Sequence, residues 1–494
     1  MYYVSTRDHK RNLTATEAIT QGLARDGGLL TPAYIPKLPA DSLESLKTMS
    51  YQQRAVYIMS LFLSGYSTAE LVGFSDKAYS PTKFDHDKIA PLSALDDATY
   101  CLELWHGPTA AFKDMALQML PHLLTAALTK NVEKKDVCIL VATSGDTGKA
   151  ALEGFRDVKG TKIIVFYPKD GVSEIQALQM KTQEGQNVGV CAVKGNFDDA
   201  QSGVKTLFSD EELRARLERK DVFLSSANSI NWGRVLPQIV YYISAYCDLL
   251  NAEKITVGDP INFCVPTGNF GNILAAFYAK RMGLPIGKLI CASNRNNVLT
   301  DFIQTGIYDR NRTFYNTMSP SMDILVSSNL ERLLFTLSDG DSELISTYMD
   351  QLNKGGRYEI SGLLKNKIQK DFYSGSCDDE QTQKVIAKVW EKYHYLIDPH
   401  TAVAFDVMEQ YRAATEDLTT TVVVSTASPF KFCDHVLTAL GETNLSTGTD
   451  LLDQLAQVTG LTPPVPLAAL AKKQIRFEQC VEKTEMMDVV LALN

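Results

Sequence analysis

The sequence predicts an α/β fold with open, largely parallel sheets covered by helices. Three observations predict it. Several apolar runs are each followed by a loop of small residues and then a helical pattern, as in 137–142 before TSGDTG and 261–265 before PTGNFGN. The runs have the length, and several have the Val and Ile content, of strands buried on both faces. Hydrophobic residues make up 45% and charged residues 22% of the 494 residues, as in ordinary globular proteins.

Six apolar runs are predicted as strands: 137–142, 162–166, 188–193, 261–265, 288–292 and 421–424. In open α/β sheets, ligands bind beyond the carboxyl ends of the strands. The glycine-rich loops of this chain fall at those ends, so we expect the functional site there.

The composition also changes along the chain. Residues 1–95 mix helical segments with the turn-rich run RDGGLLTPAYIPKLP, which predicts a smaller N-terminal domain. The remaining region, 96–494, carries the strand–loop–helix units. Within it, 296–390 is more polar and is predicted as a mainly helical insertion.

Charge and cysteine usage exclude several classes of protein. The net charge is −9 without a basic patch, which argues against a nucleic-acid binder. The stretch 260–279 is free of charge but is broken by proline and glycine, so it is not a membrane span. Nine cysteines without C-x-x-C spacing, and no apolar signal segment, favour a cytoplasmic protein. The histidine spacing predicts no metal site.

The segment HGPTAAFKDMAL contains a candidate reactive lysine, Lys113. A helix is expected to begin near Thr109 or Ala110, with Thr109 as its N-cap. Lys113 would then lie in the first turn, where the helix dipole disfavours a cation. Apolar neighbours give little solvation, so both effects favour the neutral amine that forms a Schiff base with a carbonyl. A lysine that reaches solvent beside Asp114 is the competing interpretation.

Two loops at strand ends are candidate anion sites. PTGNFGN (266–272) can turn successive backbone N–H groups toward one point at a helix N-terminus, although it matches neither a Rossmann fingerprint nor a Walker A loop. ATSGDTGKAA (142–151) offers hydroxyls and N–H groups for a second anion. A tight strand–helix turn and a capped helix start are the alternatives.

Two further segments carry polar side chains. In SSANSINWGR, Arg234 is the best candidate for a bidentate phosphate contact, near Asn228, Ser229 and Asn231. The alternative is a polar loop with Arg234 on a solvated face. At the strand end VVVSTASPFKF, the hydroxyl of Ser425 or Thr426 is a candidate partner for a heteroaromatic nitrogen. The alternative is a strand-end hydroxyl whose hydrogen bonds are satisfied within the fold. In DPHTAVA, the Asp-Pro pair predicts a capped helix start with a structural histidine.

In this order, the motifs resemble those of the threonine synthase family, fold-type II enzymes that depend on pyridoxal phosphate (PLP), in its longer bacterial and fungal branch. The resemblance runs from LARDGGLLTP through HGPTAAFKD, ATSGDTGKAA, NSINWGR and PTGNFGN to DPHTAVA and STASPFKF. It implies two open, largely parallel sheet domains, one of them a smaller mobile subdomain at about 110–240 that closes over the ligand.

The resemblance also implies roles for single residues. Lys113 is the catalytic PLP lysine, and Asp146 stands beside the cofactor's 3-hydroxyl, where many relatives carry Asn. An ionised Asp146 there would be turned away, protonated or balanced by Lys149. The implied contacts to the cofactor are Gly268, Asn269, Phe270, Gly271 and Asn272 for its phosphate and Thr426 for its pyridine nitrogen. The implied contacts to the substrate are Ser144, Gly145 and Thr147 for its carboxylate and Asn231, Arg234, Ser229 and Lys149 for its phosphate.

The implied reaction is β,γ-elimination of phosphate from O-phospho-L-homoserine, followed by addition of water at Cβ to give L-threonine. The alternatives are another fold-type II enzyme, such as a serine/threonine dehydratase, and a non-catalytic homologue that binds PLP or a phosphorylated ligand. We expect a monomer or homodimer that acts on a small molecule, without nucleic-acid or membrane partners.

Overall fold

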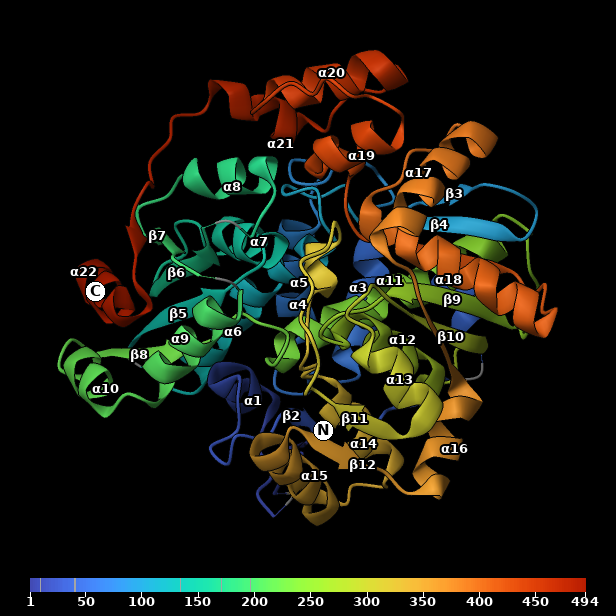
Figure 1. Ribbon diagram of the computed structural model, residues 1–494. Helices are drawn as coiled ribbons and strands as arrows, with labels where there is room; N and C mark the ends of the chain where they lie inside the picture. Colours follow the sequence, from blue (N-terminus) through green and yellow to red (C-terminus); the bar gives the residue numbers. More distant parts are fainter. Residues whose placement is uncertain (9, 40, 134, 170, 196) are drawn as a thin grey trace.

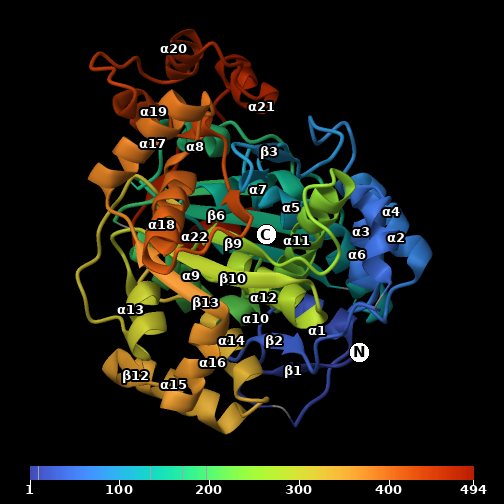
Figure 2. The ribbon, with the colours of Figure 1, turned by 90° about the vertical axis from the view of Figure 1, so that its right-hand side faces the viewer.

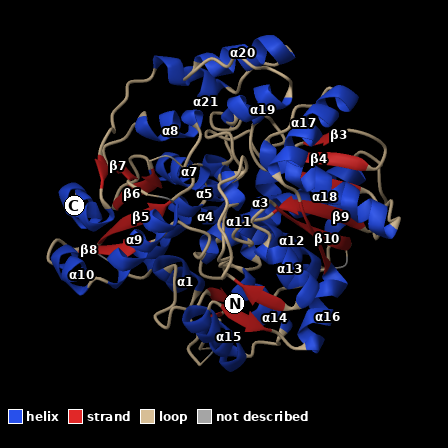
Figure 3. Cartoon of the chain, viewed as in Figure 1, coloured by secondary structure: helices blue, strands red, loops and turns tan. Residues whose placement is uncertain are grey.

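The computed structural model describes residues 1–494 except residues 9, 40, 134, 170 and 196. Two sheets lie on either side of the centre of the molecule, each covered by helices, with loops between them (Figures 1 and 3). This arrangement confirms the predicted α/β fold, and each of the six predicted strands is present. Within the described residues, no helix is long and apolar enough to cross a membrane.

The smaller sheet has five parallel strands in the order β15-β7-β6-β5-β8. Alternate side chains of β5 (Asp136–Ala142) enter different cores, with Ile139 on one face and Leu140 on the other. Both faces are buried, which explains why this run is apolar at successive positions. Its other strands and the helices around it are β6 (Thr161–Pro168), β7 (Val188–Val193), β8 (Val222–Ser225), α6 (Leu120–Lys130), α7 (Asp146–Phe155), α8 (Glu174–Lys181), α9 (Phe197–Ser209) and α10 (Glu211–Glu218).

The larger sheet has the order β13-β10-β9-β14-β4-β3, and only β3 is antiparallel to its neighbour. Helix α18 (Pro399–Thr415) packs along it. The Asp398 carboxylate accepts the backbone N–H groups of His400 and Thr401, so the predicted helix start is confirmed. The strands and remaining helices are β3 (Leu92–Ala94), β4 (Thr99–Glu103), β9 (Ile261–Pro266), β10 (Ile286–Ser293), β13 (Phe372–Ser376), β14 (Thr421–Ser425), α11 (Trp232–Asn251) and α12 (Gly271–Met282).

The N-terminal helices pack against α6 and α11, as Figure 2 shows. Three of these helices begin with a capping box, for example at Thr14, where the side chain and that of Glu17 satisfy each other's backbone N–H. Buried Arg54 forms an ion pair with Asp248 of α11 at 2.6 Å. The elements are β1 (Tyr3–Ser5), α1 (Ala15–Gln21), β2 (Leu30–Pro32), α2 (Ser42–Lys47), α3 (Tyr51–Ser60) and α4 (Thr68–Ala78).

Residues 296–390 are mainly helical, and they also supply strand β13 to the edge of the larger sheet. Their elements are α13 (Val298–Thr305), β11 (Ile307–Asp309), η1 (Pro320–Met322), α14 (Leu330–Leu337), α15 (Ser342–Gly355), β12 (Arg357–Glu359), α16 (Gly362–Asp371) and α17 (Asp379–Tyr393).

The C-terminal segment passes from the larger sheet to the smaller one, where it adds β15 beside β7. Its elements are η2 (Pro429–Lys431), α19 (Cys433–Ala439), α20 (Asp450–Thr459), α21 (Val465–Ala468), η3 (Ala469–Lys472), β15 (Cys480–Val481), η4 (Lys483–Glu485) and α22 (Met486–Leu493).

His106 links the end of β4 to the segment between α4 and β3 through two carboxylates. Its Nδ1 lies 2.6 Å from Asp85 and its Nε2 lies 2.8 Å from Glu103. Burial would lower the pKa of His106, but the hydrogen bonds and charges of the two carboxylates raise it to about 9. The protonated ring therefore stabilises the fold, since it is bound more tightly than in the unfolded chain.

We expect the stabilisation of the folded protein by protonated His106 to be complete below the ordinary histidine pKa of 6.5. It should be lost as the pH rises through the pKa of about 9 in the folded protein. The free energy of unfolding should fall by up to ~3 kcal/mol over this range. Urea unfolding of the wild type and of His106→Gln at about pH 6 and about pH 10 measures it. An equal pH dependence in both proteins would contradict the prediction.

Candidate active site

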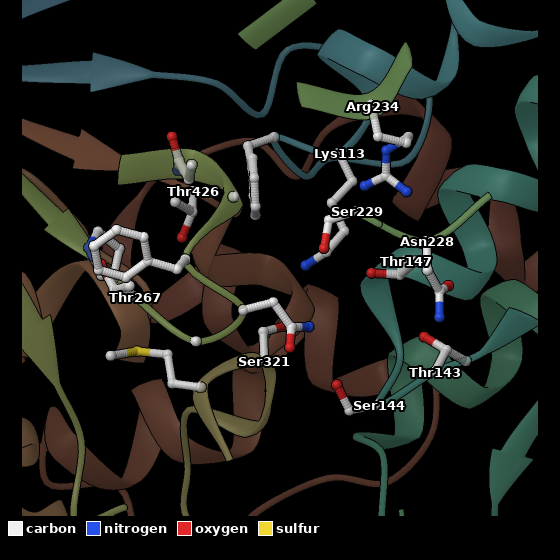
Figure 4. A pocket seen from close by; sticks show the side chains of 18 of the residues that line it. Lys113, Thr143, Ser144, Thr147, Asn228, Ser229, Arg234, Thr267, Ser321 and Thr426 are labelled. Atoms are coloured by element: carbon white, nitrogen blue, oxygen red, sulfur yellow. The ribbon is translucent and has the colours of Figure 1, made fainter. Parts of the chain in front are cut away.

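A cavity lies between the two sheets, at the carboxyl ends of their strands (Figure 4). Ser144 in the loop after β5 and Thr147 at the start of α7 line it, as do residues 266–272, which run from the end of β9 to the start of α12. Thr426 directly follows β14, and Ser229 comes from the segment between β8 and α11. The parallel topology brings these distant loops to one place.

Lys113 lies in this cavity, but its local structure differs from the prediction. The helix α5 (Asp114–Leu117) begins after Lys113, so Thr109 is not its N-cap. Instead, the Asp114 carboxylate accepts the backbone N–H and the hydroxyl of Thr109, each at 2.8 Å. This contact holds 109–113 as a loop, and the backbone N–H of Phe112 donates to the carbonyl of Thr426 at 2.8 Å. A local side-chain contact and a long-range backbone contact thus replace the predicted first turn.

The environment of Lys113 favours the neutral amine mainly through burial. The residue is partly exposed where it meets the cavity. Burial lowers the pKa of Lys113 to about 8, Asp146 opposes this change, and the positive charges of Arg234 and Lys431 add to it. The predicted contribution of the helix dipole is small, because α5 has only four residues. An appreciable fraction of the amine is neutral near physiological pH.

Residues 266–272 have the geometry expected of an anion cradle. A Cβ on Gly268 would lie 2.5 Å from the carbonyl oxygen of Ser321, so only glycine fits. The side-chain oxygen of Asn272 accepts the hydroxyls of Tyr241 and, at 2.6 Å, Tyr242. Its amide nitrogen is then left buried without a hydrogen-bond partner among the residues that the structure describes. An unpaired donor beside the N-terminus of α12 fits a bound phosphate.

A second group of unpaired polar atoms surrounds Arg234. Arg234 is buried, and its Nη1 donates to the carbonyl of Ala227. In the described part of the chain, neither its buried Nε nor the buried side-chain oxygen of Asn228 has a hydrogen-bond partner. Burial lowers the pKa of Arg234 to about 10, so the side chain stays cationic at neutral pH. In Figure 4, Arg234 and Lys113 border the same space, with Ser229 and Asn228 close by. Among the described residues, no carboxylate pairs with this buried cation, and an unpaired buried cation favours an anionic ligand.

Asp146 is balanced by a cation, and that cation is Lys431 rather than Lys149. The Asp146 carboxylate lies 2.8 Å from the Lys431 amine and accepts the amide N–H of Gln176 at 2.8 Å. Burial would raise the pKa of Asp146, but Lys431, Lys113 and His400 hold it well below its ordinary value. Lys149 instead contacts Glu153 at 3.2 Å.

Most of the predicted site residues lie in the cavity wall: Lys113, Ser144, Thr147, Ser229, Arg234, Gly268, Asn269, Phe270, Gly271, Asn272 and Thr426. Gly145, Asp146, Lys149 and Asn231 are not part of it. Asn231 is the N-cap of α11, where its side chain accepts the N–H of Gly233 and donates to the carbonyl of Ile19 at 3.1 Å. Thr143, Asn228, Ser321 and His400 also line the cavity, although no ligand contact was predicted for them from the sequence.

The sequence around these four residues marks only some of them as candidate site residues. Asn228 stands beside Ser229 in the motif that contains Arg234, so that motif pointed to the right loop. Ser321 comes from the insertion, where no local pattern marks it.

Three family descriptions match successive parts of the chain. "Threonine synthase N terminus" matches residues 2–79, "Pyridoxal-phosphate dependent enzyme" matches 87–427, and "Threonine synthase, C-terminal" matches 401–489. The second description alone covers more than half of the chain.

Named relatives agree with these descriptions. The threonine synthase of Schizosaccharomyces pombe is 39% identical over 467 residues, covering 89% of each chain. Human threonine synthase-like 1 is 39% identical over 506 residues, covering 98% of this chain and 67% of the relative, so the chain spans about two thirds of that protein. The crystal structure of PLP-bound threonine synthase from Brucella melitensis has a TM-score of 0.87 and 36% identity, covering 100% of this chain and 99% of the other. The chain therefore belongs to the threonine synthase family of PLP-dependent enzymes.

Proposed function

We propose that this protein converts O-phospho-L-homoserine and water into L-threonine and phosphate. The observation that carries the proposal is the second anion site, beside Lys113. Arg234 is buried, and no ion pair joins it to a carboxylate among the described residues. The cradle at 268–272 suits the phosphate of the cofactor, so the site around Arg234 is left for a substrate that carries its own phosphate.

The chain's residues fit the cofactor. Lys113 supplies the amine, 268–272 supply the phosphate cradle, and Thr426 supplies a hydroxyl for the ring nitrogen. When bound, PLP supplies an electron sink that makes the protons on the substrate's α and β carbons acidic.

Lys113 is the proton carrier in the proposed reaction. Because its pKa is about 8, the neutral amine takes the proton from Cα. Cβ loses one proton as phosphate leaves, and Cγ gains one to become the methyl carbon. Water then adds its hydroxyl to Cβ, and the protonated amine returns a proton to Cα. Arg234, Asn228 and Ser229 hold the substrate phosphate while its C–O bond breaks, and the cation stabilises the charge on the departing phosphate. Ser144 and Thr147, on the smaller-sheet side, hold the substrate carboxylate.

The smaller subdomain, 110–240, is proposed to close over the substrate and to exclude water until phosphate has left. Phe197 and Gln201 of α9, from this subdomain, border the cavity. We expect small-angle scattering to show a more compact protein when a non-reactive phosphonate analogue of the substrate is bound. Identical scattering with and without the analogue would contradict closure.

Incubation of the purified protein with phosphohomoserine, with phosphate and threonine measured together, tests the function. We expect equal amounts of both products. Phosphate without threonine would indicate another elimination product, and deamination of serine or threonine alone would indicate a dehydratase. Binding without turnover would indicate a non-catalytic homologue. A cytoplasmic location, a monomeric or homodimeric state and the lack of nucleic-acid partners stay predictions.

Gly268→Ala is expected to weaken PLP binding by about ten-fold or more, because the added Cβ would force the loop away from the backbone of Ser321. Fluorescence titration with PLP measures the dissociation constant. Gly73→Ala is a matched control, since nothing lies within 4 Å of its added Cβ. Equal PLP affinities for Gly268→Ala and the wild type would contradict the assignment of the cradle.

A further inference from the structure

Lys431 is a fully buried lysine that the reaction outlined above does not use. It ends η2, shortly after Thr426 on the larger-sheet side. Its amine lies 2.8 Å from the Asp146 carboxylate and donates to the carbonyl of Thr109 at 2.9 Å. Neither Lys431 nor Asp146 is part of the cavity wall, so neither is placed to touch the substrate.

The Asp146–Lys431 pair joins the two halves of the protein. Asp146 begins α7 beside the smaller sheet, and Gln176 of α8 donates to the same carboxylate. The Ser173 hydroxyl donates to the backbone carbonyl of Lys431 at 2.8 Å. From the insertion, the hydroxyl of Ser321 approaches Asp146 at 3.4 Å.

Besides acting on each other, Lys113 and Asp146 are influenced by three charged or titratable side chains, Arg234, Lys431 and His400. Asp146 raises the pKa of Lys113, whereas Arg234 and Lys431 lower it. Asp146 is in turn stabilised as an anion by Lys431, by Lys113 and by His400. Asp146 therefore has two lysines within electrostatic reach, and its 2.8 Å contact is with Lys431. If Lys431 were neutral, Lys113 would be the lysine left to compensate this buried anion.

We propose that Lys431 is a positioning residue of the reaction: it occupies the Asp146 carboxylate and so prevents Asp146 from holding Lys113 as a permanent cation in an ion pair. Lys113 then remains free to give up its proton. This inference rests on the proposed role of Lys113, and it explains how the chain accommodates an aspartate beside its reactive amine. Removing the charge of Lys431 and removing that of Asp146 should therefore have opposite effects on how tightly Lys113 holds its proton.

The test compares Lys431→Met, Asp146→Asn and the double variant. The readout is the pH midpoint for acetylation of Lys113 in the cofactor-free full chain, followed by peptide mass spectrometry. We expect Lys431→Met to move the midpoint up, because Asp146 then holds the proton on Lys113. Asp146→Asn should move it down, because Lys431 then repels that proton without compensation. The double variant should return toward the wild type, because both charges are absent.

Lys280→Met is the matched control, since it breaks another Lys–Asp contact of 2.8 Å, with Asp371, away from the cavity. It is expected to lower the melting temperature without moving the midpoint. If Lys431→Met does not fold, Asp146→Asn and the double variant, which leaves no unpaired charge, decide the question. An unmoved midpoint in Lys431→Met, or a double variant displaced as far as Asp146→Asn, would overturn the proposal.

This readout requires neither substrate nor turnover, so its result is separate from that of the phosphohomoserine assay. In the PLP-loaded enzyme, the acid limb of the pH profile of kcat/KM should move in the same direction as the midpoint in each variant. A loss of activity with an unmoved acid limb would mean that the pair has only a structural role, and would also overturn the proposal.

Discussion

Replacing Lys113 with alanine is expected to lower the turnover number for phosphohomoserine by about 10³-fold or more, because it removes both the attachment to the cofactor and the proton carrier. The fold should persist. Burial penalises the charged form of Lys113, so its removal relieves an unfavourable interaction. We expect the melting temperature of the cofactor-free protein to stay equal or to rise.

Phosphate release and borohydride trapping of PLP measure this prediction. The wild type should carry the reduced adduct at Lys113, and the alanine variant should carry none. Lys113→Arg should be equally inactive, because a guanidinium keeps its proton at neutral pH. An adduct at another lysine of the wild type would contradict the assignment.

Replacing Arg234 with alanine is expected to lower kcat/KM for phosphohomoserine by about 10²–10³-fold, because the substrate phosphate would then be buried without its cation. Binding of PLP should change much less, since the cradle at 268–272 lies on α12 and the loop before it. The free energy of unfolding should not fall by the amount typical of a broken ion pair, since no ion pair joins Arg234 to a carboxylate among the described residues.

Steady-state kinetics with phosphohomoserine and with serine separate the candidate functions. A dehydratase would not depend on Arg234, so an unchanged rate with phosphohomoserine would contradict the proposed function. Arg234→Lys should recover part of the loss, because it restores the charge without the bidentate geometry. Arg216→Ala is the matched control, since it removes an exposed arginine paired with Glu212 on α10.

The predicted strands show how much of the fold can be derived from local patterns. The run 188–193 became β7 with the same bounds, and 261–265 became β9 with one further residue. Strands such as these are buried on both faces, so their apolar character is visible in consecutive residues. Strands β13 and β15 were not predicted, because FYSGS of β13 lacks a run of Val or Ile and β15 has only two residues, and both pair at a sheet edge with strands distant in sequence.

The prediction for Asn231 shows the limit of reasoning from a motif. Asn228, Ser229 and Asn231 stand close together, and nothing in that spacing says which of them meets a ligand. The structure makes Asn231 the N-cap of α11, while Asn228 and Ser229 line the cavity. An N-cap is defined by where the helix begins, and that depends on packing as well as on local preference.

The sequence by itself determined that the chain is an α/β protein with reactive and anion-binding loops at the carboxyl ends of its strands, because those patterns lie within short segments. The tertiary structure decided which charges meet. It placed Lys431, rather than the nearby Lys149, against Asp146, and it made burial rather than a helix dipole the main influence on the pKa of Lys113. The physical reason is that Coulomb and desolvation energies depend on distance and burial in space, which only the packing of distant segments sets.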